Sequence, residues 1–439
     1  MGTIMTAVAL APGAPAEVRS PAELGIAAIV LARRLAADVS VDDRGAPQWI
    51  GDEIDLAASP DGSVLKTGPV DDGLLTGRAG IALALAAAAR HARDASLSLL
   101  AQATLADVLD RRRAARRGQL GWQSGDLGIA IAAERIADLL GRPDLAHRGR
   151  VLAARAVAAL ATADDSWLPG YADLLDGSAG HLLAVLAAAL PASAERHRAA
   201  AAERLVRDLR ARAVVDVCGA RWPMADGDRA VTGLAHGSSG IGLALLAADW
   251  AGVVGADRAL ADAAWTWEDA GYGAEDGGWY DLRLDEPAIG LAWCHGAPGI
   301  GIAAALRSRI DGGDAFEGEA TYLRALRSIQ RARREFPDEQ GEDATLCHGR
   351  SGIVELHLAG AEAAWSTDAA SREEHRRAAR YEASVIAAGI DADGSATFSH
   401  GVRGGWSPAV LDGTSGVVLT LLRCAGPLAS VAHPPLRLR

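Results

Sequence analysis

The segment GLAHGSSGIGLALL, residues 233–246, decides the fold because its form recurs along the chain. In this segment a G-x-x-G pair, Gly237 and Gly240, opens a run of apolar residues. Successive copies of the pair lie roughly 48 to 64 residues apart, as expected when one supersecondary unit is repeated. The seven pairs are Gly77/Gly80, Gly125/Gly128, Gly177/Gly180, Gly237/Gly240, Gly296/Gly299, Gly349/Gly352 and Gly413/Gly416.

Two kinds of helix are expected to alternate along the repeats. Those opened by G-x-x-G, such as GIALALAAAA, are apolar on nearly every face, which is typical of buried helices. Those between them, such as 193–213 and 317–336, are rich in Arg and Glu on one face. The pattern predicts an all-α fold, an α/α toroid in which an outer ring of helices wraps seven inner helices. An open solenoid is the alternative, but its concave inner face would be polar.

The glycines also predict where the ends of the inner helices lie. Without side chains they allow neighbouring helix ends to approach closely, and we expect free backbone N–H groups at one end of the ring. Two other segments read as surface structure. The first, 41–63, is expected to form a loop or short hairpin, and 265–287 is expected to form a loop near the same end of the ring.

Composition narrows the class of protein. The formal charge of −12 argues against a nucleic-acid-binding protein and is compatible with a basic peptide partner. No apolar run is long enough to span a membrane, and the start lacks the basic region of a signal peptide, so a cytoplasmic protein is expected. We divide the chain into an N-terminal arm, helix and loop (1–70) and one toroid domain (71–439).

Cys and His residues break the repeat at one position. Cys294 and Cys347 both stand two residues before their glycine, and His295 and His348 stand one before. Equal phase in equivalent hairpins predicts equal height, so these side chains should converge at one mouth of the ring. Two thiolates and one imidazole suit a zinc ion with an open fourth position. We assign Cys294, Cys347 and His348 as ligands, with His295 as the competitor of His348.

Other polar and aromatic residues are expected around this mouth. His236 shares the phase of the ligands without a neighbouring Cys and could act as a general acid or base. Asp173, four residues before its glycine, could face the same space. Trp293, Trp279 and Tyr280 are expected to wall the cavity rather than react.

Three motifs, GLAHGSSGIGLALL, LAWCHGAPGIGIA and LCHGRSGIVELHL, resemble those of the lanthionine synthetase C-like family. The resemblance covers about residues 70–425, and WCHGAPGI, LCHG and GGWYDLR are most similar to the cyclase domain of bifunctional lanthipeptide synthetases. It implies an α/α toroid, zinc on Cys294, Cys347 and His348, and active-site roles for His236 and Asp173.

One departure concerns the substrate-binding residues. Many members of the family have Arg four residues before the first zinc Cys, where this chain has Gly290. Arg283 in the adjacent segment could replace it. We also expect His295 and Trp293 to contact the substrate.

The resemblance implies a cyclase of lanthipeptide biosynthesis that adds substrate Cys thiols to dehydroalanine or dehydrobutyrine, giving thioether rings. Its partners would be a dehydrated precursor peptide and a separate dehydratase or kinase-lyase, because no dehydratase or kinase region is found here. Two alternatives stay open. One is addition of glutathione or another thiol to dehydroamino acids, and the other is a non-catalytic helical scaffold for a modification complex.

Overall fold

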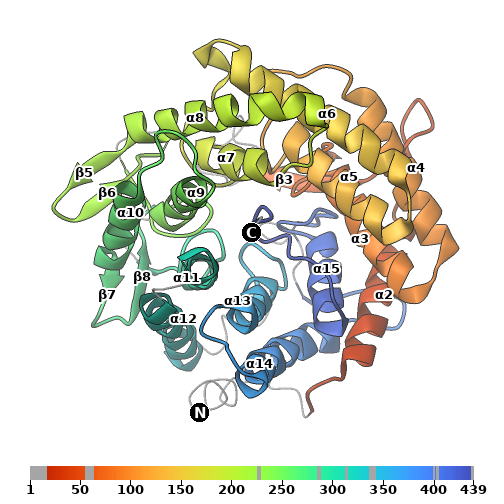
Figure 1. Cartoon of the computed structure of the whole chain (residues 1–439). Coiled ribbons are helices and arrows are strands. Elements are labelled where there is room, and N and C mark those ends of the chain that lie inside the picture. Colours follow the sequence, from red (N-terminus) through yellow and green to blue (C-terminus); the bar gives the residue numbers. More distant parts are fainter. Residues whose placement is uncertain are drawn as a thin grey trace.

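The computed structural model describes residues 17–54, 64–224, 229–283, 288–311, 315–335, 343–398, 401 and 405–436. The first 16 residues of the expected N-terminal arm lie outside this part of the chain. Figure 1 shows the helices arranged as two concentric rings. This arrangement confirms the all-α toroid.

Each inner helix begins directly after the first glycine of a G-x-x-G pair, and almost all of its residues are buried. In α3, for example, every residue from Arg78 to Ala89 is buried. The inner helices are α3 (Arg78–Ala92), α5 (Asp126–Leu140), α7 (Ser178–Ala187), α9 (Ser238–Trp250), α11 (Ala297–Asp311), α13 (Arg350–Glu362) and α15 (Thr414–Ala425).

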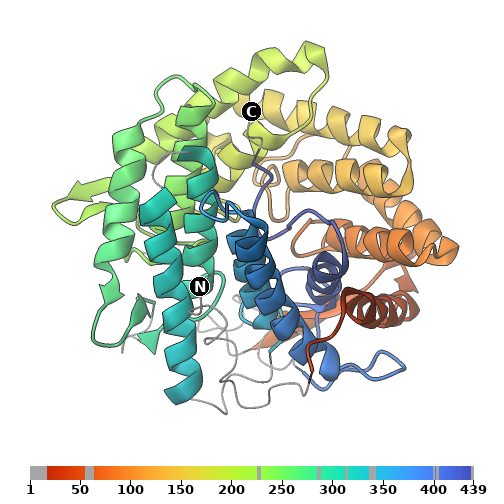
Figure 2. The ribbon, with the colours of Figure 1, turned by 60° about the horizontal axis from the view of Figure 1, so that its bottom comes forward.

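The outer helices bury one face each against an inner partner. Each even-numbered helix from α4 to α14 packs on the inner helix that precedes it in the chain. Figure 2 shows this for the orange pair α3/α4 and the yellow pair α5/α6. The outer helices are α2 (Pro21–Ala37), α4 (Ala95–Arg111), α6 (Pro143–Thr162), α8 (Glu195–Arg212), α10 (Arg258–Ala270), α12 (Ala315–Glu335) and α14 (Ala369–Ala388).

The ring is closed rather than open. Each inner helix contacts the next, and the last, α15, contacts the first, α3. Helix α2, the first helix described, packs on α15 and so supplies the outer partner of the last repeat. The expectation of closure is therefore confirmed, whereas the boundary near residue 70 stays a prediction.

The second glycine of each pair lets the preceding loop cross the first turn of its helix. A Cβ atom on Gly240 would lie 2.0 Å from the carbonyl oxygen of Leu234, and one on Gly299 would lie 2.0 Å from that of Trp293. The same loops satisfy N–H groups at the helix start. In α7, for example, Ser178 N–H donates to the Tyr171 carbonyl at 3.1 Å. The expectation of free N–H groups was wrong for these positions, because the loop returns over them.

Backbone hydrogen bonds between neighbouring loops set the helix starts at one level. Most acceptors are the carbonyls two residues before the first glycine of a pair. Ala235 N–H donates to Cys294 O at 3.2 Å, and Cys347 N–H donates to Leu411 O at 2.8 Å. Leu411 N–H continues the series to Leu75 O at 2.9 Å. This bonding explains why equal phase in the sequence gives equal height in the ring.

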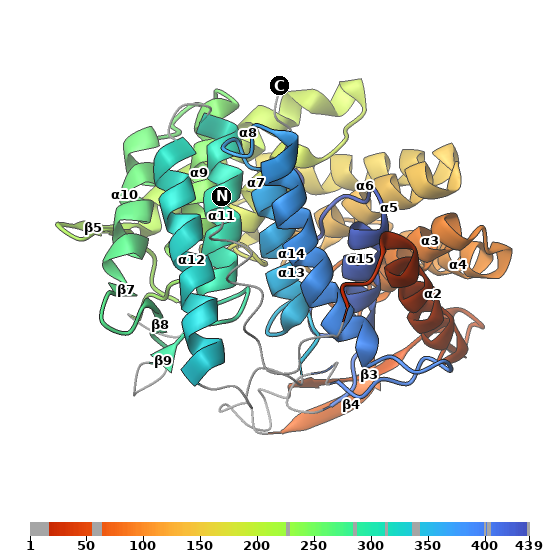
Figure 3. The same cartoon turned by 90° about the horizontal axis from the view of Figure 1, so that it is seen from below.

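Short strands lie at the end of the ring where the inner helices begin, as Figure 3 shows for β3, β4 and β9. They form three antiparallel pairs and one three-stranded sheet, β7-β8-β9. The strands are β1 (Ser40–Val41), β2 (Pro47–Gln48), β3 (Ile50–Ile54), β4 (Leu65–Pro69), β5 (Val214–Asp216), β6 (Gly219–Arg221), β7 (Tyr272–Gly273), β8 (Gly278–Asp281) and β9 (Ala288–Ile289). Two 3-10 turns, Asp165–Trp167 and Ala192–Ala194, complete the described elements.

Both segments expected at the surface contain some of these strands. The described part of 41–63 forms strands of hairpins, which agrees with the expected loop or short hairpin. The other segment, 265–287, is not simply a surface loop. Its start belongs to α10, and Trp279 in β8 is fully buried with its indole N–H bonded to the Glu268 carbonyl at 2.9 Å.

Candidate metal centre and acid–base pair

Two thiols and one imidazole come together at the end of the ring where the inner helices begin. The Sγ atoms of Cys294 and Cys347 lie 3.4 and 3.7 Å from Nε2 of His348. All three candidate ligand atoms lie within 4.8 Å of one another. Both cysteines are buried, whereas His348 is exposed, so the cluster is open to solvent on its histidine side.

The loops before α11 and α13 place these side chains. Trp293 N–H donates to the carbonyl of Cys347 at 2.8 Å, which joins the two loops beside the thiols. The carbonyl of each cysteine accepts a hydrogen bond from the neighbouring loop, in the series that sets the helix starts at one level. The side chains therefore meet although 53 residues separate them in the sequence.

The donor set fits zinc. Tetrahedral zinc with Zn–S bonds of about 2.3 Å and Zn–N bonds of about 2.0 Å requires S-to-N separations of about 3.5 Å. The observed 3.4 and 3.7 Å match this value. Three protein ligands also leave one coordination position for a substrate, as in catalytic zinc sites.

The two thiols differ in acidity because they interact with each other. A hydrogen bond with Cys347, followed in weight by one with His348, lowers the pKa of Cys294 well below its usual value despite burial. The hydrogen bond with Cys294, together with burial, raises the pKa of Cys347. One thiolate is thus favoured in the protein alone, which prepares the cluster for a cation.

A second pair of side chains lies beside the cluster. Nδ1 of His236, just before α9, is 2.7 Å from Oδ2 of Asp173, in the loop before α7. The other carboxylate oxygen of Asp173 accepts the Gly177 N–H at 2.8 Å, which fixes the carboxylate. With Nδ1 bound to Asp173, Nε2 is the nitrogen of His236 left to exchange a proton with a substrate.

This pair favours a protonated imidazole. Burial lowers the pKa of His236, but the hydrogen bond and the charge of Asp173 outweigh burial and raise it above the usual value. Cys294 acts in the same direction. The raised pKa of His236 favours its imidazolium form, the form from which a general acid donates.

His295 lies against His236 rather than with the Cys294–Cys347–His348 cluster. Its ring stacks on that of His236, with centroids 4.7 Å apart and planes 14° apart. It is buried, and its Nδ1 has no hydrogen-bond partner within the described structure. Burial lowers the pKa of His295 to about 4, which favours its neutral form.

A guanidinium faces the same space. Asp281 holds Arg283 in a two-point ion pair, with Nε–Oδ1 and Nη2–Oδ2 distances of 2.9 and 2.6 Å. Burial would lower the pKa of Arg283, but Asp281 and the charges of Cys294 and Cys347 raise it. Arg283 is thus close enough to the thiol cluster for their charges to interact.

The position of Gly290 shows why no side chain stands there. A Cβ atom on this residue would lie 2.6 Å from the carbonyl oxygen of His295. The Gly290 carbonyl also accepts the first N–H of α11, from Ala297, at 3.0 Å. The backbone is therefore packed against the loop that carries Cys294 and His295.

The three aromatic residues expected to wall the cavity occupy different places. Trp293 is 1 % exposed, and its indole N–H donates to the Ala432 carbonyl at 3.1 Å, in the C-terminal segment. A contact with substrate would require this ring to be uncovered. Trp279 is likewise buried, whereas the Tyr280 hydroxyl donates to Asp276 at the surface.

Sequence reasoning missed Glu268 of α10. This buried carboxyl accepts N–H groups on both sides of His236, from Gly233 at 2.7 Å and from Ser239 at 2.8 Å. Burial raises the pKa of Glu268 to about 8 despite these bonds. Its only sequence signal is an acidic residue on the buried face of an amphipathic helix, which does not identify a partner.

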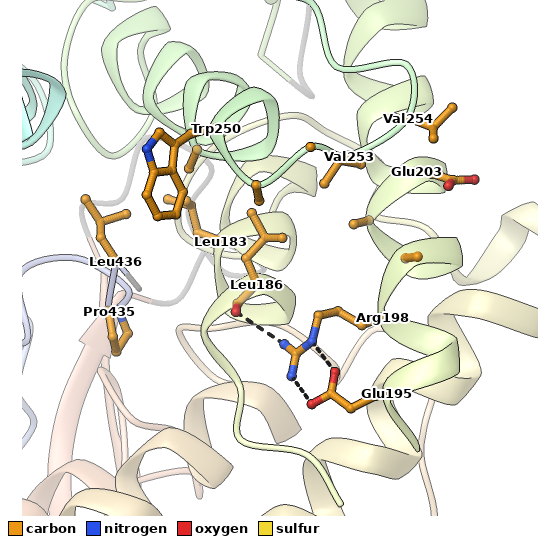
Figure 4. A pocket seen from close by; sticks show the side chains of 15 residues that line it. Leu183, Leu186, Glu195, Arg198, Glu203, Trp250, Val253, Val254, Pro435 and Leu436 are labelled. Carbon is orange, nitrogen blue, oxygen red and sulfur yellow. Dashed lines mark hydrogen bonds and ion pairs between the residues drawn. The ribbon is translucent and has the colours of Figure 1, made fainter. Parts of the chain in front are cut away.

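Two cavities help to locate substrate space. One of about 240 Å³ contains Asp173 and His236 and is walled by side chains that include Tyr171, Met224 and Ile241. A larger cavity of about 370 Å³ lies between α7, α8, α9 and the C-terminal Pro435 and Leu436 (Figure 4). It is lined by residues from the ends of α7 and α9, away from the starts of the inner helices, and by none of the candidate residues.

The comparisons with known proteins agree with this picture. The family profile described as lanthionine synthetase C-like protein matches residues 68–434. A solved structure titled nisin cyclase superposes with a TM-score of 0.55 at 18% identity, covering 80% of this chain and 88% of that one. No curated protein sequence matches. Among the described residues, no helix is both long and apolar enough to cross a membrane.

Proposed function

Because the chain belongs to the lanthionine synthetase C-like family, we propose that it is a zinc-dependent peptide cyclase. It adds cysteine thiols of a substrate peptide to dehydroalanine or dehydrobutyrine in the same peptide, forming lanthionine or methyllanthionine rings. The observation that carries the proposal is the Cys294–Cys347–His348 cluster with the His236–Asp173 pair on the adjacent loop.

In this proposal Cys294, Cys347 and His348 would hold the zinc ion. When bound, zinc lowers the pKa of a coordinated thiol, so that a thiolate exists at neutral pH. The solvent-exposed side of His348 is where the substrate cysteine enters. His295 does not belong to the ligand set, because its ring lies against His236.

His236 and Arg283 act on the electrophile. The new S–Cβ bond forms as the double-bond electrons move toward the carbonyl oxygen, where the Arg283 cation stabilises the developing charge. His236 then gives its proton to Cα through Nε2, and it regains one when the next thiol ionises. Asp173 keeps the imidazole oriented and charged for this transfer.

Ring closure gains from holding both reacting groups in one space. With thiol and dehydro residue in the same peptide, the addition is effectively unimolecular, which contributes several kcal/mol. The reaction consumes a peptide from which water has already been removed at Ser or Thr. We therefore also propose a separate dehydratase or kinase-lyase as partner and place the protein in the cytoplasm.

The test is ring formation on a pre-dehydrated peptide containing one dehydroalanine and one cysteine. Addition leaves the mass unchanged, so loss of the free thiol is measured by alkylation and mass spectrometry. We expect wild type to close the ring and Cys347→Ala to lose both activity and bound zinc. Cys218→Ala, which removes an exposed thiol of the β5–β6 hairpin, is the matched control.

Three results would separate the alternatives. Equal ring formation by Cys347→Ala would refute the metal mechanism. Addition of glutathione to a dehydro peptide, without closure of its own cysteine, would favour the intermolecular reaction. Absence of bound zinc and of both reactions would favour a scaffold.

A further inference from the structure

A groove on the outer wall of the ring collects positive charge. It lies between the end of α4 and the middle of α6, which pack side by side in the outer ring (Figure 1), and its volume is about 440 Å³. The lining combines four guanidinium groups, one imidazole and one carboxylate with an apolar floor. These residues are Arg112, Arg113, Arg148, Arg155, His147, Asp110, Leu109, Val151 and Leu152.

Part of this charge is not paired with a carboxylate in the groove. Arg155 donates to the backbone carbonyls of Arg112 and Arg113, and its charge also acts on the buried carboxyl of Asp126. Arg113 likewise donates from Nε to the carbonyl of Asp110 at 3.1 Å. The carboxylate of Asp110 pairs with Arg148 at 2.9 Å and is the one acidic group in the lining.

Other arginines extend the charge along the adjoining segment. Within the lining itself, Arg112 is paired with Asp72 and Asp126 at 3.5 and 3.4 Å. Arg116 and Arg117 follow in the same segment and are exposed. The chain as a whole carries a net charge of −12, so this local excess of positive charge is opposite in sign to the total.

The groove lies toward the end of the ring that carries the candidate metal cluster. The segment 112–125 runs from the end of α4 to the start of α5, and all inner helices start at that end. A chain bound in the groove can therefore continue across the same face toward the cluster.

We propose that this groove, which we call the arginine groove, binds an acidic and partly apolar segment of the peptide substrate, outside the residues that form rings. The proposal rests on the proposed function only in taking a peptide as substrate. The apolar floor of Leu109, Val151 and Leu152 favours a peptide over a nucleic acid backbone or free phosphate. Carboxylates then pair with guanidinium groups at the rim.

Binding is measured without catalysis, using the Cys347→Ala chain as host. The probe is a short fluorescein-labelled peptide of Glu, Leu and Gly, and fluorescence anisotropy gives its affinity. Introducing Arg113→Glu with Arg148→Glu should weaken binding at least about tenfold, since charge-assisted hydrogen bonds are lost. Arg113→Lys with Arg148→Lys should keep most of the affinity. Raising the salt to about 1 M should weaken binding by screening.

The matched control places the same charge change elsewhere. Arg376 and Arg377 are exposed on α14, and their double change to Glu should leave the affinity unaltered. Thermal unfolding checks that every variant folds. Equal weakening by both double variants, equal binding of a Gln-for-Glu peptide, or preferential binding of a labelled RNA oligonucleotide would overturn the proposal.

The two proposals fail in different ways. Selective binding of the acidic peptide without ring formation by the wild-type chain would leave the arginine groove standing and remove the cyclase. Ring formation with no selective binding would do the reverse.

Discussion

The imidazoles of His236 and His295 lie face to face, 4.7 Å apart between centroids and 14° from parallel. The two Cys-His dipeptides, 294–295 and 347–348, therefore differ in use. In the first, the histidine turns toward the acid–base pair. In the second, it faces the two thiols.

The stacking of His236 on His295 predicts that two substitutions at His295 differ in their effect on turnover. His295→Phe keeps a flat ring against His236 and should retain most of the turnover. His295→Ala removes the support and should lower kcat about tenfold, the equivalent of an aromatic contact of about 1.4 kcal/mol. Bound zinc, measured by atomic emission, should remain in both. Loss of zinc from either variant would make His295 a ligand after all.

Asp173→Asn should alter the pH profile as well as the rate. Asp173 raises the pKa of His236, and only the protonated imidazole donates a proton, so activity falls as pH rises through that pKa. Removing the carboxylate charge moves this fall to lower pH and should cost about 10² in kcat. Profiles of kcat against pH check the shift, with Asp164→Asn, a surface change in the same loop region, as control. An unmoved alkaline limb would contradict the role.

Glu268 predicts a pH dependence of stability. Its pKa is raised from 4.5 to about 8 in the folded chain, so the folded state holds the proton more tightly than the unfolded state. The stability gained from this proton is complete below about pH 4.5 and is lost as pH rises to about 8. Each unit of pKa difference corresponds to about 1.4 kcal/mol at most.

Glu268→Gln tests this behaviour because the amide cannot ionise. Its melting temperature should fall less than that of the wild type between pH 5 and pH 8. Glu362→Gln, at an exposed position of α13, should follow the wild type. Parallel curves for Glu268→Gln and the wild type would show that Glu268 is ionised throughout.

Trp293 predicts a link between the C-terminal segment and the metal cluster. Trp293→Phe keeps an aromatic ring, but the smaller ring leaves space and loses the hydrogen bond to Ala432, which together should cost more than about 1 kcal/mol in the free energy of unfolding. The substitution leaves the Ala432 carbonyl without its donor, next to residue 293, which directly precedes Cys294. Urea unfolding measures the loss, and no change would mean that water replaces the indole N–H.

Gly290 predicts that the usual arginine cannot be restored by substitution. A Cβ atom would approach the His295 carbonyl to 2.6 Å, so Gly290→Ala should destabilise the fold by about 1 to 3 kcal/mol. Gly290→Arg should likewise fail to rescue an Arg283→Ala variant in the ring-forming assay. Rescue would show that the loop carrying His295 yields to a side chain.

The repeat made the fold predictable. Seven G-x-x-G pairs identify the inner helices, and their common phase places Cys294, Cys347 and His348 together before any coordinate is known. The sequence could not show that loop carbonyls return over the helix starts, because that depends on chain direction outside the motif.

Other features lay beyond the pattern for a similar reason. Glu268, on the outer helix α10, accepts backbone N–H groups on both sides of His236, a contact made only once α10 has packed on α9. The His236–His295 stack depends on side-chain rotation that spacing does not encode. The strands at 272–289 are too short to show an alternating pattern. Each of these depends on tertiary packing.

The contact between α2 and α15 has a consequence for biosynthesis. During translation α2 is made long before α15, the helix it packs on most extensively, so part of its apolar face stays uncovered until α15 has left the ribosome. A nascent chain stopped before residue 414 should therefore remain sensitive to protease at 21–37, and chaperones have their clearest target in that helix.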